Sequence, residues 1–258
     1  MKPLEKRGGK RNMIWILLIL IIAVLLFAQF LFGYTTIRFP YRRKNGKKRI
    51  ACIGDSITYG CTVPLFFLQR YPAVLQRLLG KEVQVGVFGV NDRTLQSTGN
   101  KPYRKEQAFR QSKEFLPDTV VILLGTNDSK DENWQTGEAF VQQYKELIEA
   151  YRTLPSTPQI VLCTPPCGFE PIHRLFYVTN DAKLDRIPEI ADLVRTVAAD
   201  EELPLVDLYA LTEGRRELFG PDGLHPFPAG ASVIADAVGQ AIMQSVLMAR
   251  KQYNHDLS

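Results

Sequence analysis

Five short apolar runs rich in β-branched residues follow residue 48, and stretches with helical periodicity separate them. Because parallel neighbouring strands need a crossover, which is usually a helix, this alternation predicts a parallel sheet with helices on both faces. We therefore expect a three-layer α/β/α sandwich around a five-stranded parallel sheet. The predicted strands are residues 49–54, 82–89, 119–125, 159–164 and 204–208, and the clearest predicted helices are residues 65–79, 136–154, 188–202 and 228–248.

An apolar segment over residues 13–32 precedes this pattern, and only Gln29 in it is clearly polar. Twenty apolar residues match the length that a helix needs to cross a bilayer core. A cleaved signal peptide is the alternative, but its apolar region is usually shorter. Its small-x-small cleavage pattern is also missing, since Leu26 stands two positions before Ala28. The segment predicts one uncleaved transmembrane helix.

The formal net charge of +5 and the pI near 9.0 raise the question of a nucleic-acid partner. Residues 1–49 carry 12 of the 32 Lys and Arg residues but one of the 27 acidic residues, so the rest of the chain is acidic by six charges. The basic residues flank the apolar segment, where they would meet anionic lipid headgroups. We therefore expect a membrane as partner and no nucleic acid.

The domain organisation follows from these shifts in composition. We expect the predicted membrane helix to lie between a basic tail and a basic linker, and one large α/β domain to come before a short polar tail. Basic residues on both sides of the helix give opposite indications of topology, and we favour a single-pass protein of the cell membrane with an extracellular domain. The predicted parts are residues 1–12, 13–32, 33–48, 49–250 and 251–258.

The chain has four cysteines, Cys52, Cys61, Cys163 and Cys167. An even count outside the cell permits disulfides without demonstrating any. Cys52 and Cys163 fall inside apolar runs, so we expect them to be small buried strand residues. No His lies near enough in sequence to complete a zinc pattern, and we expect no metal.

Three of the predicted strands end in Gly before a polar loop, and in parallel sheets the reacting groups gather at the carboxyl ends of the strands. The first such loop reads Gly54-Asp55-Ser56. A Ser in this strand-to-helix turn can present its hydroxyl above the sheet edge, while N–H groups at the helix start face a developing oxyanion. The alternative is that Ser56 only caps a helix.

Asn127 lies in the sequence Gly125-Thr126-Asn127-Asp128, which again follows an apolar strand. If the two strands are near neighbours, its side-chain amide can donate to the same oxyanion as the Ser56 turn. Taken alone, Asn-Asp after Gly is an ordinary turn.

His225 is the best-placed candidate for a catalytic base. Of the three His residues, His255 lies in the polar C-terminal tail and His173 in an irregular loop, whereas His225 precedes the last long helix. Asp222, three residues earlier, can reach the other ring nitrogen and fix the tautomer. A turn Asp and a surface His are the alternative for this loop by itself.

These three blocks, in this order, resemble the GDSL or SGNH hydrolase family of serine esterases and lipases over residues 50–245. The resemblance implies a flavodoxin-like sheet and a reaction without cofactor or metal. It also implies that Ser56 is the nucleophile, His225 the base and Asp222 its partner. The oxyanion would be held by Asn127 and by backbone N–H groups including that of Ser56.

One block departs from the family pattern, because Asp92 stands where the family usually has the Gly that donates its backbone N–H. A backbone N–H survives any side chain, and Asp tolerates left-handed dihedrals better than most residues. A carboxylate beside an oxyanion is unfavourable unless it is paired, and Arg93 or a nearby base could pair with it. We keep Asp92 in the predicted oxyanion hole and expect lower activity or an altered acyl preference.

The run Gly125–Lys130 followed by Asn133-Trp134 further resembles bacterial carbohydrate O-acetylesterases of this family, of the sialate or xylan type. Trp134 could stack on a sugar ring, although an aromatic residue that opens a helix more often packs in the core. Asp55 and Arg93 are the other candidate substrate contacts.

We therefore expect a membrane-anchored serine esterase that hydrolyses short acyl esters, preferably acetate on a carbohydrate, through an acyl-enzyme, and no obligate protein partner. A lysophospholipase or lipase, and an O-acyltransferase that uses the same triad, are alternatives. A non-catalytic, membrane-tethered glycan-binding protein is an alternative of another class, and only Asp92 supports it.

Overall fold

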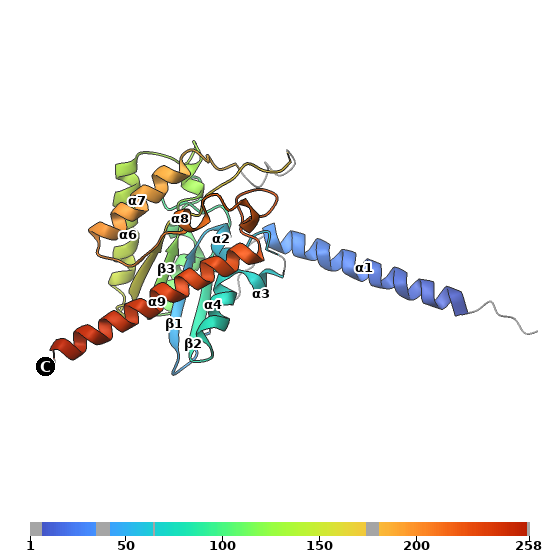
Figure 1. The fold of residues 1–258 in the computed structure, drawn as a ribbon, viewed down its shortest axis with the longest axis horizontal. Coiled ribbons are helices and arrows are strands. Elements are labelled where there is room, and N and C mark those ends of the chain that lie inside the picture. The colour runs from blue at the N-terminus through green and yellow to red at the C-terminus, as the bar shows by residue number, and fades with distance from the viewer. Residues whose placement is uncertain (1–6, 35–41, 64, 174–180, 257–258) are drawn as a thin grey trace, which may run out of the picture.

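The computed structural model describes residues 7–34, 42–63, 65–173 and 181–256. It confirms the predicted five-stranded parallel sheet, whose order is β2-β1-β3-β4-β5 (Figure 1). The strands are β1 (Lys48–Gly54), β2 (Val83–Gly89), β3 (Thr119–Leu123), β4 (Gln159–Cys163) and β5 (Leu205–Val206).

Helices cover both faces of this sheet, as the alternation of strands and helices predicts. The helices that the structure describes are α1 (Arg7–Tyr34), α2 (Ser56–Tyr59), α3 (Phe66–Gln69), α4 (Tyr71–Leu79), α5 (Gln107–Glu114), α6 (Gly137–Arg152), α7 (Ile187–Asp200), α8 (Leu208–Thr212) and α9 (Pro228–Asp256), and α1 is not among those that cover the sheet. Short 3₁₀ turns lie at Tyr103–Lys105, Asn127–Ser129 and Arg216–Leu218.

Successive residues of each strand point to opposite faces, so the sheet separates two apolar cores. In β1, Ala51 and Ile53 pack into one core with side chains of α6 and α7. Ile50 and Cys52 pack into the other core, with side chains of α4 and α9. The three layers therefore follow from two apolar faces on every central strand.

The predicted helix over residues 65–79 is interrupted at Arg70, whose backbone is extended (φ −62°, ψ 149°) and separates α3 from α4. Pro72 explains this break. Inside a continuous helix its ring would clash with the carbonyl of Leu68, but it fits the first turn of a new helix.

The sequence pattern misses two short helices of the domain, and its largest boundary errors are at the last strand and the last helix. The short helices α5 and α8 were not predicted. The last predicted strand, residues 204–208, is only two residues long in the structure, because Asp207 caps α8 by accepting the N–H of Ala210. Helix α9 continues to Asp256, so residues 251–256 extend this helix. Residues 257–258 of the predicted tail lie outside the described residues.

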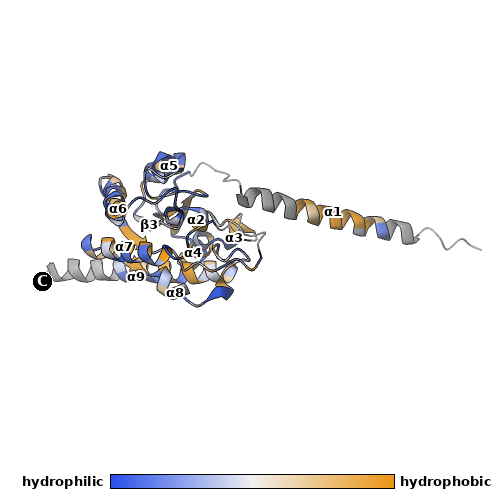
Figure 2. Cartoon of the chain, turned by 90° about the horizontal axis from the view of Figure 1, so that it is seen from above, coloured by the Kyte–Doolittle hydropathy of each residue, from blue (hydrophilic) through white to orange (hydrophobic). Residues whose placement is uncertain are grey.

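Helix α1 covers the predicted apolar segment, and its residues 12–25 are exposed. The coloured part of this helix is mostly orange, that is hydrophobic, in Figure 2. Among the residues whose side chains the structure describes, no helix has the length and apolarity that a membrane crossing requires. The side chains of residues 26–32, and residues 1–6 and 35–41 of the predicted tail and linker, lie outside the described part.

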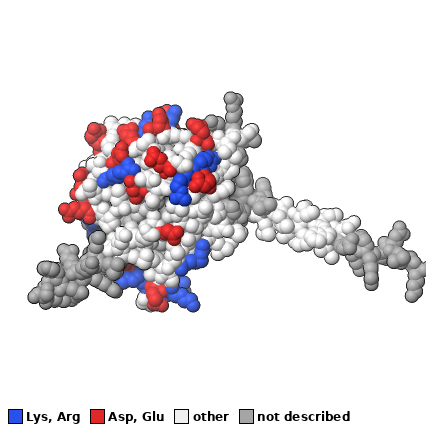
Figure 3. Space-filling model, viewed as in Figure 1, with Lys and Arg blue, Asp and Glu red and all other residues white. Residues whose placement is uncertain are grey.

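Acidic and basic side chains are interspersed on the face of the domain that Figure 3 shows, and basic residues form no separate patch there. Acidic and basic residues of the domain also form ion pairs across elements, such as Lys145 of α6 with Asp200 of α7 at 2.8 Å. This face offers no continuous positive surface to a phosphate backbone.

Gly54, the last residue of β1, leaves room for a close approach of the nucleophile turn to β3. A Cβ atom at this position would lie 2.3 Å from Thr58 Oγ1 and 2.4 Å from the carbonyl oxygen of Leu123. The second atom belongs to the backbone of a central strand, which cannot easily move.

We predict that Gly54→Ala lowers the free energy of unfolding by about 1–3 kcal/mol, because the added methyl group overpacks this contact. Gly239→Ala in α9 is the matched control. Its Cβ would meet Leu75 Cδ1 at an ordinary 3.5 Å, and Ala is favoured over Gly in a helix by roughly 0.5–1 kcal/mol. Urea unfolding of both variants checks this, and equal stability of the two would contradict it.

Candidate active site

The candidate site lies at the carboxyl edge of the sheet, where the ends of three strands are level. Gly54 of β1 pairs with Gly89 of β2 on one side and with Leu123 of β3 on the other. The loops that follow these strands therefore start side by side, and they carry Ser56, Asp92 and Asn127. The loop before α9, which is closed by a bridge between Phe219 and Pro226, brings His225 to the same edge.

Ser56, His225 and Asp222 form a continuous chain of hydrogen bonds. Ser56 Oγ lies 2.8 Å from His225 Nε2, and Asp222 Oδ2 lies 2.7 Å from His225 Nδ1. All three residues are buried, with 7%, 5% and 2% of their surfaces exposed for Ser56, His225 and Asp222. An imidazole held in this way can accept the serine proton while the carboxylate fixes its tautomer.

The Asp222 carboxylate also shapes its own loop. Its Oδ1 atom accepts the backbone N–H groups of Leu224 and His225, both at 3.0 Å. Burial raises the pKa of Asp222, but the hydrogen bonds and the charge of His225 outweigh burial, so its pKa lies below the ordinary value. Asp222 is therefore ionised at neutral pH, as an orienting partner of the imidazole requires.

Ser56 begins α2, and Asp55 caps this helix by accepting the N–H of Ile57 at 2.9 Å. Burial raises the pKa of Asp55 to about 7, although the Ile57 hydrogen bond and the charge of His225 oppose this. Within the described residues, neither the backbone N–H of Ser56 nor that of Asp92 has a protein acceptor. Both donors are available to a developing oxyanion.

Asn127 is buried beside the nucleophile turn, and its side-chain amide has a fixed orientation. Its Nδ2 atom donates to the carbonyl oxygen of Arg93 at 3.2 Å and lies 3.5 Å from Asp55 Oδ2. Its backbone carbonyl accepts Asn133 Nδ2 at 2.8 Å. An amide has two N–H donors, so one hydrogen can stay on Arg93 while the other exchanges its long hydrogen bond to Asp55 for one to the oxyanion.

Asp92 has a left-handed backbone, with φ at +61°. This conformation is the one that Gly adopts freely, and Asp reaches it at lower cost than most residues. Its carboxylate forms an ion pair with Lys101 at 3.1 Å. Partial burial raises the pKa of Asp92, but the Lys101 hydrogen bond and the charge of Lys130 outweigh burial and lower its pKa.

A cavity of about 260 Å³ opens over Ser56 and His225. Its described walls are mostly polar and include charged groups of both signs, Lys101 and Lys130 among them. The Lys130 side chain is nine-tenths buried and forms an ion pair with Asp181 at 2.8 Å. Such a lining suits a hydroxyl-rich molecule better than a long hydrocarbon chain.

The three candidate substrate contacts are not among the residues that line this cavity. Asp55 is fully buried as the cap of α2. Arg93 forms an ion pair with Glu106 at 2.6 Å, so the partner of the Asp92 carboxylate is Lys101 and not Arg93. The Trp134 ring packs against the Phe140 ring at 6.0 Å, in the manner of a core aromatic.

Several residues of the cavity wall were not predicted from the sequence to be site residues. Lys130 and Asn133 line the cavity and follow Asn127 by three and six residues in the same loop. Their closeness to Asn127 in the sequence is a signal that could have predicted this position. Cys61 follows the nucleophile turn and was considered only for disulfides and metal, whereas it is a free thiol in the cavity wall. Lys101 carries no local signal, because its position depends on how the loop after β2 folds back.

Asp128 has a structural role that its place beside Asn127 in the sequence does not reveal. Its buried carboxylate accepts the backbone N–H groups of Leu95 and Gln96, both at 2.8 Å. Burial raises the pKa of Asp128 to about 6, although these hydrogen bonds oppose this. The carboxylate thus ties the loop after β3 to the loop that carries Asp92.

A serine hydroxyl, an imidazole and a carboxylate joined in this order above a parallel sheet define a serine hydrolase of α/β architecture. The chain belongs to the GDSL-like Lipase/Acylhydrolase family, whose model matches residues 52–233. This confirms the family that the three sequence blocks indicate.

Among curated proteins, an acetylxylan esterase of Xylanibacter ruminicola is 37% identical over 216 residues, which are 77% of this chain and 44% of the relative. The chain thus spans less than half of that relative's length.

Similar solved structures share the fold. A lipase/acylhydrolase from Enterococcus faecalis is 26% identical with a TM-score of 0.58, and the match covers 76% of this chain and 95% of that one. A carbohydrate acetylesterase family member from Sinorhizobium meliloti has a TM-score of 0.61 at 23% identity over 76% and 98%. An aryl esterase of M. smegmatis has a TM-score of 0.62 at 23% identity over 76% and 99%.

We predict that Asp92→Gly raises kcat for a neutral acetate ester roughly three- to tenfold, because it removes a negative charge beside the oxyanion and keeps the left-handed backbone donor. Asp92→Asn, which keeps the size and loses the charge, should act in the same direction. Lys101→Met, which leaves the carboxylate unpaired, should lower kcat. Steady-state kinetics of the three variants measure this, and unchanged rates for both Asp92 variants would refute it.

Proposed function

We propose that this protein is a serine esterase that removes acetyl groups from carbohydrate through an acyl-enzyme. The observation that carries the proposal is the hydrogen-bonded chain from Ser56 through His225 to Asp222, at 2.8 and 2.7 Å, beneath a polar cavity. Ser56 is the nucleophile, His225 the base and Asp222 its orienting partner.

In the first half of the reaction, Ser56 Oγ attacks the ester carbonyl carbon while His225 Nε2 takes the hydroxyl proton. The carbonyl oxygen becomes an oxyanion and accepts hydrogen bonds from the N–H groups of Ser56 and Asp92 and from the Asn127 amide. When the C–O bond to the alcohol breaks, His225 gives its proton to the leaving oxygen. In the second half, His225 deprotonates a water molecule, which attacks the acyl-enzyme and releases the acid and Ser56.

Two observations favour an acetylated carbohydrate as substrate. The cavity walls are polar and charged, and they can form hydrogen bonds with the hydroxyl groups of a sugar. The curated relative at 37% identity is named as an acetylxylan esterase. A lysophospholipid ester is the second candidate, since a membrane-bound site would lie near such lipids, and transfer of the acyl group to a sugar hydroxyl is the third.

We predict that the full chain releases acetate from p-nitrophenyl acetate and from acetylated xylan, and that Ser56→Ala and His225→Ala each lose at least about a hundredfold in kcat. Asp222→Asn should lose a comparable factor, because the imidazole tautomer is no longer fixed. Ser232→Ala in α9, a Ser outside the site that bonds the carbonyl of Pro228, is the matched control and should keep its rate.

Product analysis with an added sugar acceptor separates the rival functions. Free acetate alone supports hydrolysis, and an acetylated acceptor supports transfer. A wild-type chain that turns over no ester but retains xylan on an affinity column would replace the esterase by a glycan-binding protein.

We further propose that α1 anchors the protein in the cell membrane and that the domain lies outside the cell. The apolar sequence runs over residues 13–32, and the basic residues gather at its two ends. Side chains such as Trp15, Ile19 and Leu25 are 55% or more exposed, and water is an unfavourable environment for them.

If α1 is an anchor, the full chain should remain with phospholipid vesicles after a wash in 1 M salt, whereas a variant lacking residues 1–41 should elute. Attraction of the basic residues to lipid headgroups is screened at that ionic strength, so retention then requires apolar insertion. Flotation on a density gradient is the measurement. Elution of the full chain along with the truncated one would count against the anchor.

A further inference from the structure

The cavity over Ser56 is lined mostly by residues with polar or charged side chains. Among the described residues that line it, Cys61 is the one whose side chain is neither charged nor a strong hydrogen-bonding group. The remaining walls carry carboxylates, amines, amides, a hydroxyl and an imidazole. Cys61 is therefore the described wall residue whose side chain best suits a small apolar group.

The Cys61 side chain is held at a fixed place relative to the nucleophile. Its backbone N–H donates to the carbonyl oxygen of Ser56 at 2.9 Å, and so does the N–H of Gly60. Gly60 ends α2 in the left-handed conformation, which turns the chain so that Cys61 follows directly beside the nucleophile turn. With 5% of its surface exposed, Cys61 has little freedom to move away from Ser56.

When Ser56 attacks an ester, the three groups on the carbonyl carbon, which are the oxygen, the alcohol and the acyl group, must each face a different part of the site. The oxygen points to the N–H donors of Ser56 and Asp92, and the leaving alcohol must face His225 Nε2, which protonates it. The acyl group takes the direction that remains. In this cavity the polar walls suit the alcohol, and the thiol wall suits a methyl group.

We propose that Cys61 forms the wall against which the acyl group packs, and that its side chain limits the acyl group to acetate. This inference rests on the proposed esterase function and adds the residue that sets acyl length. A thiol fits this role because it is a small and weakly polar group. Burial, followed by the charges of Asp222 and Asp92, raises the pKa of Cys61 to about 12, so the thiol is neutral at the pH where an esterase works.

The test compares kcat/KM for p-nitrophenyl acetate, propionate and butyrate in the full chain and in three Cys61 variants. Cys61→Ala removes the sulfur, and the ratio of butyrate to acetate should rise roughly tenfold, the usual value of one or two methylene groups in an apolar site. Cys61→Leu fills the space and should lower acetate turnover roughly tenfold and butyrate turnover more. Cys61→Ser keeps the size, and its ratio should stay within about twofold of wild type.

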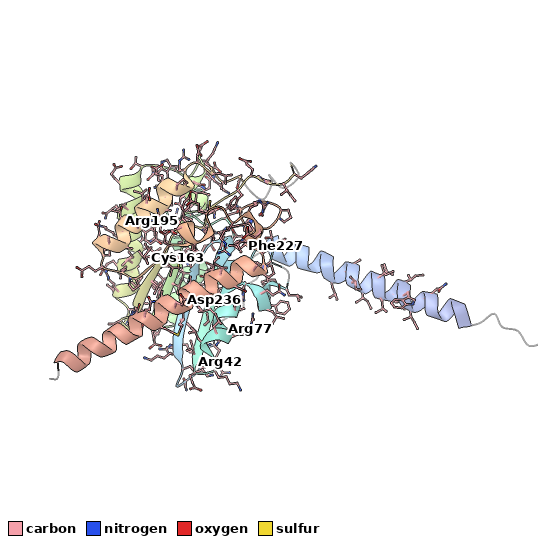
Figure 4. All side chains as sticks on the ribbon, in the orientation of Figure 1. Arg42, Arg77, Cys163, Arg195, Phe227 and Asp236 are labelled. Atoms are coloured by element: carbon pink, nitrogen blue, oxygen red, sulfur yellow. The ribbon has the colours of Figure 1, made fainter. Side chains whose placement is uncertain are left out.

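Two other cysteines provide matched controls. Cys167 is half-buried and outside the cavity lining, so Cys167→Ala should change neither rate nor ratio. Cys163 lies on β4 within the body of the domain (Figure 4), where it is fully buried. Cys163→Ala should lower the melting temperature but leave the ratio of the three esters unchanged.

Each outcome decides the proposal. A wild-type chain that hydrolyses the esters, with a butyrate-to-acetate ratio that neither Cys61→Ala nor Cys61→Leu changes, overturns the role of Cys61 alone. A wild-type chain that hydrolyses none of the three overturns the esterase function and this inference with it. Should Cys61→Leu fail to fold, as judged by circular dichroism, the Ala and Ser variants still decide the question.

Discussion

The site depends on one buried charge, the carboxylate of Asp222. Taking a carboxylate out of water costs free energy unless hydrogen bonds replace the lost solvation. Here two backbone N–H groups and the imidazole of His225 replace it. The same three bonds fold the loop and aim the ring at Ser56, so the solvation of one charge and the geometry of the base cannot be separated.

The sheet positions the other half of the site. Because the ends of β1, β2 and β3 are level, three loops far apart in sequence begin next to each other. Short contacts then connect these loops. Asn127 donates to the carbonyl oxygen of Arg93, and Asp128 accepts N–H groups from Leu95 and Gln96. The loops that carry the proposed oxyanion donors are therefore connected by hydrogen bonds between side chains and backbone, which restrict the directions of those donors.

Much of this architecture could be predicted from the sequence, because strand and helix periodicities are local properties. The order of three short blocks identified the family, and each block marks a turn at a strand end or a helix start. The break at Arg70 was missed because the apolar pattern runs on across Pro72. The short β5 was also misjudged, since the cap formed by Asp207 outweighs the apolar character of Leu208.

Side-chain partners in the cavity were harder to predict. Arg93 is adjacent to Asp92 in sequence, yet the ion pair of Asp92 is with Lys101, nine residues away, while Arg93 bonds Glu106. Trp134 packs on Phe140, and Asp55 is turned into the protein. Which charge faces which depends on the path of the loop after β2, and that path has no periodicity from which it could be read.

The left-handed backbone of Asp92 has a consequence for how this site can change over generations. Every codon for Asp differs from a codon for Gly by one base, so a single transition exchanges the two residues. Since both accept this conformation, the exchange leaves the N–H donor in place and switches one negative charge on or off beside the reacting carbonyl. Natural selection can thus adjust the electrostatics of this site in one mutational step, without passing through a misfolded intermediate.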